Sequence, residues 1–239
     1  MSEQATLRCG LPLLQPAQAQ KHVTVNDGLM RLDGLVNLVL QSVSVASPPV
    51  AVTDGQCWAV PFGAGGAWAG QAGRIAIGAN GGWVFVPPSR GQRAFVVDQG
   101  LSALWDGAAW LPGALTLGAA GGGFNAGITT GEVEITAGAG LGTGLFIPEN
   151  VLVLGLTGRV IKPITGTLTS WMIGVAGATN RYGSGLGLPL NSWSQELLSA
   201  PSAVYAAQEL RLTATGGNFA GGRVRLAVHW LALRVPDPV

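Results

Sequence analysis

The sequence predicts a mainly β fold: a short N-terminal helix, a small glycine- and tryptophan-rich β module and a C-terminal, jelly-roll-like β-sandwich. Glycine supplies 38 of 239 residues and punctuates short apolar stretches with turn signals. Eight tryptophans supply packing mass. Only 10% of residues are charged, whereas an ordinary soluble domain carries about a quarter. We therefore expect a homo-oligomer, in which subunit contacts replace charged surface.

Residues 1–49 are expected to form an anchoring or oligomerising segment. Residues 1–22 are polar and contain Pro12 and Pro16, which favour an extended arm. From Asn26, a suitable N-cap, apolar residues recur at spacings of 4-3-4-3-4 until Ser47-Pro48-Pro49 ends the pattern. This stripe consists of Val25, Leu29, Leu32, Val36, Val39 and Val43. Such a helix packs either on its own domain or in a bundle between subunits, and fewer than three heptads leave both interpretations open.

Residues 50–112 are expected to form the glycine–tryptophan β module. Short strands between turn signals are predicted at Gln56–Val60, Arg74–Ile77, Gly82–Val86, Arg93–Val97, Leu101–Trp105 and Ala109–Leu111. The pattern Asp-Gly-x-x-Trp occurs at 54–58 and 106–110, with the shorter relative Asn80-Gly-Gly-Trp83. Asn-Gly and Asp-Gly favour tight hairpin turns. A tryptophan after each turn can then cover the hairpin.

Residues 113–150 are rich in Gly, Ala and Thr, which predicts a linker or shaft, or thin β structure. The run 138–144 superficially resembles a phosphate-binding loop. Phe146-Ile147-Pro148 follows it, however, and no helix pattern is present, which excludes a nucleotide site of that kind.

Residues 151–239 are expected to form the β-sandwich. Its predicted strands are Val151–Leu154, Gly158–Pro163, Leu168–Val175, Leu210–Ala214 and Arg223–Leu233. The last is the clearest, because apolar residues alternate there with Arg223, Arg225 and His229. Alternation of this kind predicts a strand with one core face and one more polar face.

The charge pattern restricts the partners. A net charge of about +1, with no run of three basic residues, argues against nucleic acid. No apolar run approaches the roughly 20 residues needed to span a bilayer, and no secretory signal is visible. Membrane insertion is therefore not expected. Cys9 and Cys57 are too few for a disulfide framework or zinc site, so we expect both to pack.

Groups suited to catalysis are scarce, which favours a protein that is not an enzyme and has no metal or cofactor. No nucleophile-elbow pattern accompanies His22 or His229. Glycan hydrolysis needs two carboxylates beside the scissile bond, and Glu196 and Glu209 could meet only through the fold. A glycan hydrolase using Glu196 stays as an alternative.

Binding through aromatic residues is the remaining function class. Sugars present flat apolar faces and hydroxyl groups, which suit amphipathic aromatic rings beside polar donors. Asn180, Arg181 and Tyr182 combine such groups in a glycine-rich loop, and Trp193 is a further candidate. The alternative for each aromatic residue is core packing.

Several motifs resemble a known family. The run Leu11–Asn26, followed by Leu32-Asp33, resembles the start of phage-related spike and tail proteins of gene transfer agents, the phage-like particles of alphaproteobacteria. Residues 66–70 and 81–87 look like the glycine–tryptophan module of that family. Residues 171–177, 181–187 and 212–219 are similar to the last domain of its head-spike members.

The resemblance implies a head-spike or fibre subunit on the particle surface, made in the bacterial cytoplasm without a signal peptide. Its N-terminus would dock on a capsid or spike-base protein, and its C-terminal domain would attach to capsular polysaccharide of the recipient cell. A trimer suits a fibre axis, and a pentamer would suit a fivefold vertex. A connector without a ligand is the structural alternative.

Overall fold

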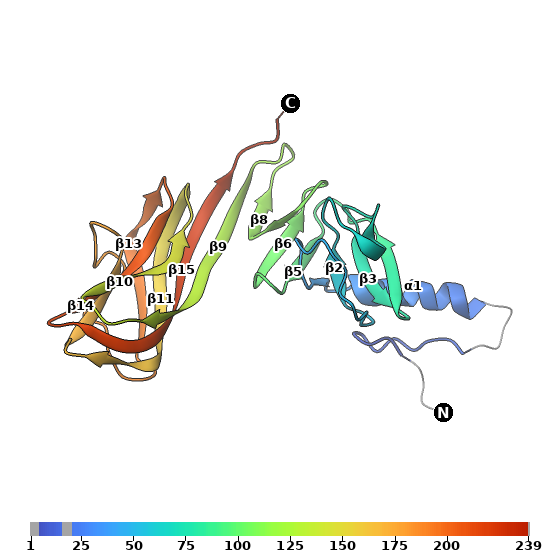
Figure 1. Cartoon of the computed structure of the whole chain (residues 1–239). Coiled ribbons are helices and arrows are strands. Elements are labelled where there is room, and N and C mark those ends of the chain that lie inside the picture. The colour runs from blue at the N-terminus through green and yellow to red at the C-terminus, as the bar shows by residue number, and fades with distance from the viewer. Residues whose placement is uncertain (1–4, 16–20, 239) are drawn as a thin grey trace. The chain divides into compact units, whose positions relative to one another are not determined.

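The chain forms two compact units, Met1–Leu117 and Gly118–Val239 (Figure 1). The computed structural model describes residues 5–15 and 21–238. Over these residues one short N-terminal helix precedes a succession of β-strands, so the predicted mainly β class is confirmed. No helix in these two ranges is long and apolar enough to cross a membrane.

The first unit contains a seven-stranded sheet in the order β4-β3-β2-β1-β5-β6-β7. The strands are β1 (Val39–Leu40), β2 (Cys57–Ala59), β3 (Ile75–Ala79), β4 (Gly82–Val86), β5 (Arg93–Val96), β6 (Leu101–Trp105) and β7 (Trp110–Pro112), and β8 (Ala114–Leu117) ends the unit. Two antiparallel meanders, β2-β3-β4 and β5-β6-β7, are joined by β1, which pairs in parallel with β2 and β5.

Helix α1 (Lys21–Leu35) is shorter and earlier than predicted. Asn37 has a φ of 46°, a left-handed conformation typical of a helix C-terminus. The chain then enters β1, where Leu40 has no exposed surface. Extension of the helix to Val43 is therefore wrong, because burial of this short segment between two strands outweighs the helical spacing.

The N-terminal arm is tied to α1 by the buried carboxylate of Asp33. Its oxygens accept hydrogen bonds from the Thr6 hydroxyl (2.8 Å) and the backbone N–H groups of Arg8 (3.2 Å) and Cys9 (2.6 Å). The Arg8 guanidinium donates to the carbonyl oxygens of Asp33, Gly34 and Asn37 at the end of the helix. These bonds satisfy carbonyl groups that have no partner within a helix.

Burial acts to raise the pKa of Asp33, but the hydrogen bonds from Thr6, Cys9 and Arg8 outweigh it and hold the pKa below its ordinary value. The predicted N-cap role of Asn26 is wrong, since Asn26 lies inside α1. Its side-chain amide instead bonds to the N–H and carbonyl of Leu14, at 2.9 and 3.0 Å.

Tryptophan packing in the first unit follows the prediction. Trp58, Trp68 and Trp83 form one cluster, with Trp83 at 5.3 Å from each of the other two ring centroids in edge-to-face geometry. Trp105 and Trp110 form a second pair, at 5.5 Å. The 3₁₀ turn Gly66–Trp68 supplies Trp68 to this cluster, and Trp68 has no exposed surface.

The two cysteines differ. Cys57 is fully buried, as predicted, and burial raises the pKa of its thiol to about 12. Cys9 is exposed, so its predicted packing role is wrong. The sequence gives no sign of this difference, because Cys9 lies on the outside of the arm while its N–H points to Asp33.

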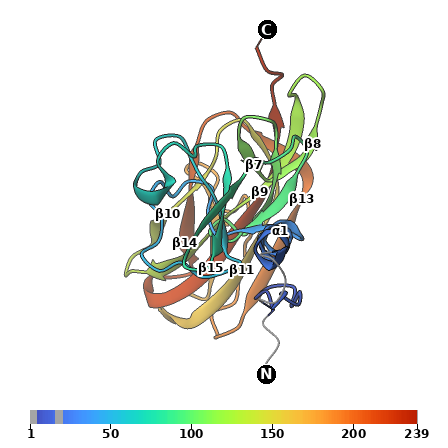
Figure 2. The same ribbon diagram turned by 90° about the vertical axis from the view of Figure 1, so that its right-hand side faces the viewer.

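The second unit is a sandwich of two antiparallel layers. One layer contains β13-β11-β15-β9 in that order, and the other contains β10-β14-β12. The strands are β9 (Gly123–Ile135), β10 (Gly140–Ile147), β11 (Val151–Gly166), β12 (Ser170–Gly174), β13 (Trp193–Val204), β14 (Gln208–Thr215) and β15 (Phe219–Arg234). Strands β11 and β15 run side by side along most of their length (Figure 2).

The glycine-rich segment 113–150 forms β structure, one of the two expectations for it, and not a separate linker or shaft. Strands β9 and β10 belong to the sandwich, and the division of the chain falls after Leu117. Gly127 faces the Trp230 ring, which lies 2.2 Å from where a Cβ would stand. At Gly131 the Leu145 side chain occupies the space that a Cβ would need. These glycines make room for core side chains. The structure likewise unites the predicted segments 1–49 and 50–112 in one unit.

Candidate functional site

The layer that contains β13, β11, β15 and β9 has one face in the core and one in solvent, which we call the outer face. On β15 Val224, Leu226 and Val228 are buried, and Arg223 and Arg225 are exposed, as the alternation predicts. Residues paired across antiparallel strands lie on the same face. The registers therefore place side chains of β13, β11, β15 and β9 in rows across the outer face.

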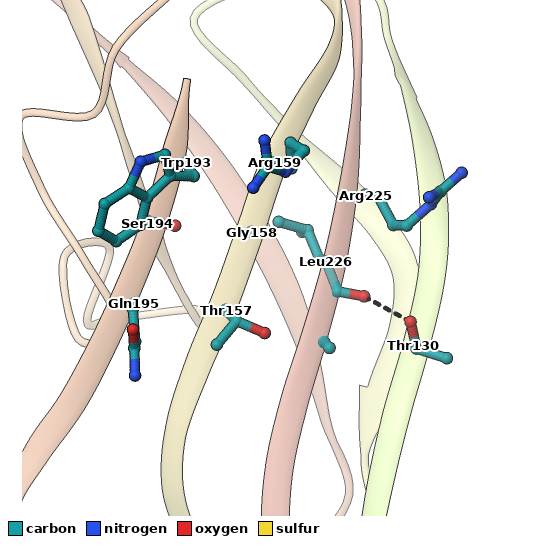
Figure 3. Close-up of a pocket in the computed structure, with 10 residues that line it drawn as sticks. Thr130, Thr157, Gly158, Arg159, Trp193, Ser194, Gln195, Arg225 and Leu226 are labelled. Atoms are coloured by element: carbon teal, nitrogen blue, oxygen red, sulfur yellow. Dashed lines mark hydrogen bonds between the residues drawn. The ribbon is translucent and has the colours of Figure 1, made fainter. Parts of the chain in front are cut away.

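One row of the outer face joins Trp193, Arg159, Arg225 and Glu132, one residue from each strand. The next row joins Gln195, Thr157, Ala227 and Thr130. A shallow depression of about 360 Å³ lies over these two rows (Figure 3). We call it the Trp193 depression.

Side-chain size explains the shape of the Trp193 depression. The short side chains of Thr157, Ala227 and Thr130 leave the sheet surface low, whereas Trp193 and the two arginines of the adjacent row rise beside it. The Thr130 hydroxyl donates to the Leu226 carbonyl at 2.9 Å, which fixes it against the sheet. The site therefore rests on paired strands rather than on loops.

Trp193 is the exposed aromatic group of this site, with 67% of its surface accessible. A tryptophan at this exposure contributes little to the core and offers an apolar ring face to solvent. Arg159 lies directly opposite it on β11, and the Gln195 amide follows two residues later on β13. An aromatic plane with a guanidinium and an amide beside it can stack on a ligand and hydrogen-bond its polar edges.

The neighbouring charges on the outer face are paired. Arg225 donates to Glu132, and Arg223 donates to Glu134, each at 2.5 Å. Lys162 lies 3.5 Å from Glu134. The hydrogen bond from Arg223 is the main cause that lowers the pKa of Glu134, and the same bond raises the pKa of Arg223.

Arg159 differs from those residues. It is exposed, and over residues 5–15 and 21–238 the structure records neither an ion pair nor a hydrogen bond from its guanidinium. Its cross-strand neighbours are Trp193 on one side and Arg225 on the other. The donors of Arg159 are thus available to a ligand in the Trp193 depression.

Residues suited to acid–base chemistry are not gathered here. His229 Nε2 lies 3.0 Å from the Thr157 hydroxyl, beside the depression. Glu196 is on β13 and Glu209 on β14, in different layers, and neither lines the Trp193 depression. Among the described residues no group of three His, Cys, Asp or Glu side chains could hold a metal ion.

The sequence-predicted ligand residues are separated by the fold. Asn180 and Arg181 are exposed in the turn after β12, but Tyr182 has no accessible surface and belongs to the core. Burial also raises the pKa of the Tyr182 phenol. Tyr182 is therefore corrected from a ligand platform to a packing residue, and of the four only Trp193 lines the depression.

Sequence reasoning missed Arg159, Thr157 and Gln195. Arg159 and Thr157 lie in a stretch where buried Leu156 and Val160 bracket them, so period-two alternation could have placed both outward. Strand β13 itself was not predicted. It carries serines, two alanines and Pro201, which weaken a strand pattern.

The far end of the outer face is apolar. Leu152, Tyr205 and Leu233 are exposed there, around a second depression of about 330 Å³ that Phe124 and Leu231 also line. The first unit exposes apolar residues too, in the stripe Val25, Leu32 and Val36 predicted from the sequence. Exposed apolar patches of this kind mark interaction surfaces.

Comparison with known proteins gives a partial family match. A family model described as a protein of unknown function (DUF2793) matches residues 25–111, inside the first unit. No curated protein matches the chain. A chain of the capsid asymmetric unit of cyanophage Pam1 is 23% identical, with 49% of this chain and 92% of that chain covered and a TM-score of 0.39. A TM-score at that level does not establish a shared fold.

Proposed function

We propose that this chain is a non-enzymatic surface subunit of a phage-like particle, such as a gene transfer agent, and attaches the particle to cell-surface polysaccharide. The sugar is held on the outer face of the second unit, and the first unit provides anchoring and self-association. The observation that carries the proposal is Trp193, exposed beside Arg159 and Gln195 in an open depression.

An open depression on a rigid sheet suits a polymer chain, because a polysaccharide can enter and leave at both ends. The indole of Trp193 would stack on a sugar ring, and the side chains of Arg159, Gln195 and Thr157 would hydrogen-bond its hydroxyl groups. The particle role is supported by the resemblance of Leu11–Asn26 and Leu32-Asp33 to gene transfer agent spike proteins.

Self-association is supported by exposed apolar residues on and directly after α1. Val25 and Leu32 lie seven residues apart on the helix, the repeat of a seam between helices, and Val36 follows its last residue; copies of this chain would bury them. We expect a trimer, with a pentamer as the alternative. Light scattering with mass measurement tests this: Leu32→Glu should dissociate the oligomer, and a monomeric wild-type protein would contradict it.

Glycan attachment is tested by binding of the full chain to bacterial cells that carry capsules and to their capsule-free mutants. Trp193→Ala should abolish the capsule-dependent binding with unchanged unfolding. Phe146→Ala is the matched control, because Phe146 is also an exposed aromatic residue of the second unit but lies on β10, in the other layer.

The two alternatives, a connector without a ligand and a capsule-degrading hydrolase, predict different results. A pure connector would bind no encapsulated cell of any type, whether or not Trp193 is present. A capsule-degrading hydrolase would release reducing ends from purified polysaccharide, and Glu196→Gln would abolish that release. Binding without new reducing ends is the outcome that the proposed function requires.

A further inference from the structure

We infer that the ligand of the Trp193 depression is an acidic polysaccharide, whose carboxylate, sulfate or phosphate groups pair with Arg159. This inference rests on the proposed function, because it names the substrate class of the same site.

The polar end of the outer face has more positive than negative charge. Four cations, Arg159, Lys162, Arg223 and Arg225, stand there with two carboxylates, Glu132 and Glu134. In the part of the chain that the structure describes, this leaves a surplus of two positive charges in two adjacent rows. The whole chain carries only +1, so the surplus is local to this surface.

The unpaired charge lies at the aromatic residue. Glu134 contacts Lys162 and Arg223, and Glu132 contacts Arg225. Arg159 lies on β11, one strand further from both carboxylates than Arg223 and Arg225, and opposite Trp193. A group bound against the indole would therefore meet the one arginine of this row that no carboxylate neutralises.

The placement of Arg159 has no evident benefit for folding. Arg159 and Arg225 face each other across β11 and β15, and like charges in directly opposed positions destabilise a sheet. An anion held between Trp193 and Arg225 would remove this repulsion. Guanidinium groups bind carboxylate and phosphate with paired hydrogen bonds, which gives such a ligand geometric specificity as well as charge.

The test uses a printed microarray of bacterial capsular polysaccharides that includes neutral polymers and polymers with uronate, sulfate or phosphate groups. The full chain, in its native oligomeric state, should bind acidic members and not neutral ones. Chemical reduction of the uronate carboxyl groups to alcohols should then weaken binding to the best uronate polymer at least tenfold. Comparison of carboxylate, sulfate and phosphate members distinguishes the anionic groups.

Matched variants locate the effect. Arg159→Gln should weaken binding to the acidic polymer at least tenfold and reduce its dependence on salt concentration. Arg211→Gln removes one positive charge from β14, in the other layer, and should change binding less than twofold. A merely electrostatic attraction by the whole chain would be weakened equally by both substitutions.

The outcomes separate the two proposals. Equal binding to native and carboxyl-reduced polymer, or to acidic and neutral members, would overturn the acidic ligand and leave glycan attachment standing. No binding to any member of the array would overturn both. Retained acidic binding in Arg159→Gln would overturn the role given to this residue and with it the inference.

Discussion

Trp68 in the first unit has no exposed surface and packs edge-to-face against Trp83, whereas Trp193 in the second unit is two-thirds exposed and lines an open depression. The charged residues differ in the same way. The Asp33 carboxylate accepts three hydrogen bonds in a buried site, while the Arg159 guanidinium donates none to the described residues. Groups whose bonding capacity is satisfied stabilise the fold, and groups left unsatisfied at an open surface are available to a ligand.

The largest expected effect is on stability of the first unit. Trp68→Ala should lower its free energy of unfolding by about 4 kcal/mol, because a buried ring leaves a cavity between Trp58 and Trp83. Trp193→Ala should change the stability of the second unit by less than about 0.5 kcal/mol. Urea unfolding followed by hydrogen exchange resolves the two units. Equal losses would remove the distinction between packed and ligand-facing tryptophan.

The second-largest loss of stability is expected at the buried carboxylate of Asp33. Asp33→Asn should lower the free energy of unfolding by about 2–3 kcal/mol, since an amide cannot accept all the hydrogen bonds from Thr6, Arg8 and Cys9. Asp27→Asn is the matched control on the same helix, where an exposed pair with Arg31 at 3.5 Å is worth about 0.3–0.5 kcal/mol. Similar unfolding midpoints in urea for the two variants would contradict the structural role of Asp33.

The same carboxylate predicts a pH dependence. The pKa of Asp33 is lower in the folded chain than in the unfolded one, so its stabilisation is complete above the ordinary aspartate pKa of about 3.9. It is lost as the pH falls through the folded pKa. Urea unfolding over a pH series should show a smaller acid loss for Asp33→Asn than for the wild type. If the free energy of unfolding fell with pH equally in both proteins, other carboxylates would account for the loss of stability in acid.

A smaller stability effect than that of Asp33→Asn is expected from the ion pairs of the outer face. Glu132→Gln breaks an exposed ion pair with Arg225 and should cost at most about 1 kcal/mol. It also leaves a second guanidinium unpaired beside the depression, so affinity for an acidic polysaccharide should rise severalfold. Glu209→Gln, on β14, is the control with the same charge change. Unchanged affinity in Glu132→Gln, measured by titration calorimetry, would argue against charge recognition at this surface.

Much of the fold follows from local patterns. Alternation predicts which residues of β15 enter the core, because side chains of a strand point to opposite faces. Asn80-Gly81 predicts the β3–β4 turn, where both residues have positive φ, at 53° and 73°. The helix prediction was less accurate, since the spacing Val25 to Val43 continues through β1.

The glycine-rich strands show why composition misled the domain boundaries. A glycine in isolation indicates flexibility, but Gly127 is required because the Trp230 ring occupies the space of a Cβ. That ring is 103 positions later in the sequence, and no local pattern reports it. The Trp230 N–H donates to Thr129 at 3.2 Å, which ties the same strands together.

Composition and short-range periodicity were enough to predict the β class, the hairpin turns at Asn80-Gly81 and Asp106-Gly107, the packing tryptophans of the first unit and the shortage of catalytic groups. The burial of Tyr182, the exposure of Trp193 and the position of Arg159 between Trp193 and Arg225 followed from the fold alone. Strand register brings together residues 34 and 66 positions from Arg159, and register depends on how the whole sandwich packs its core.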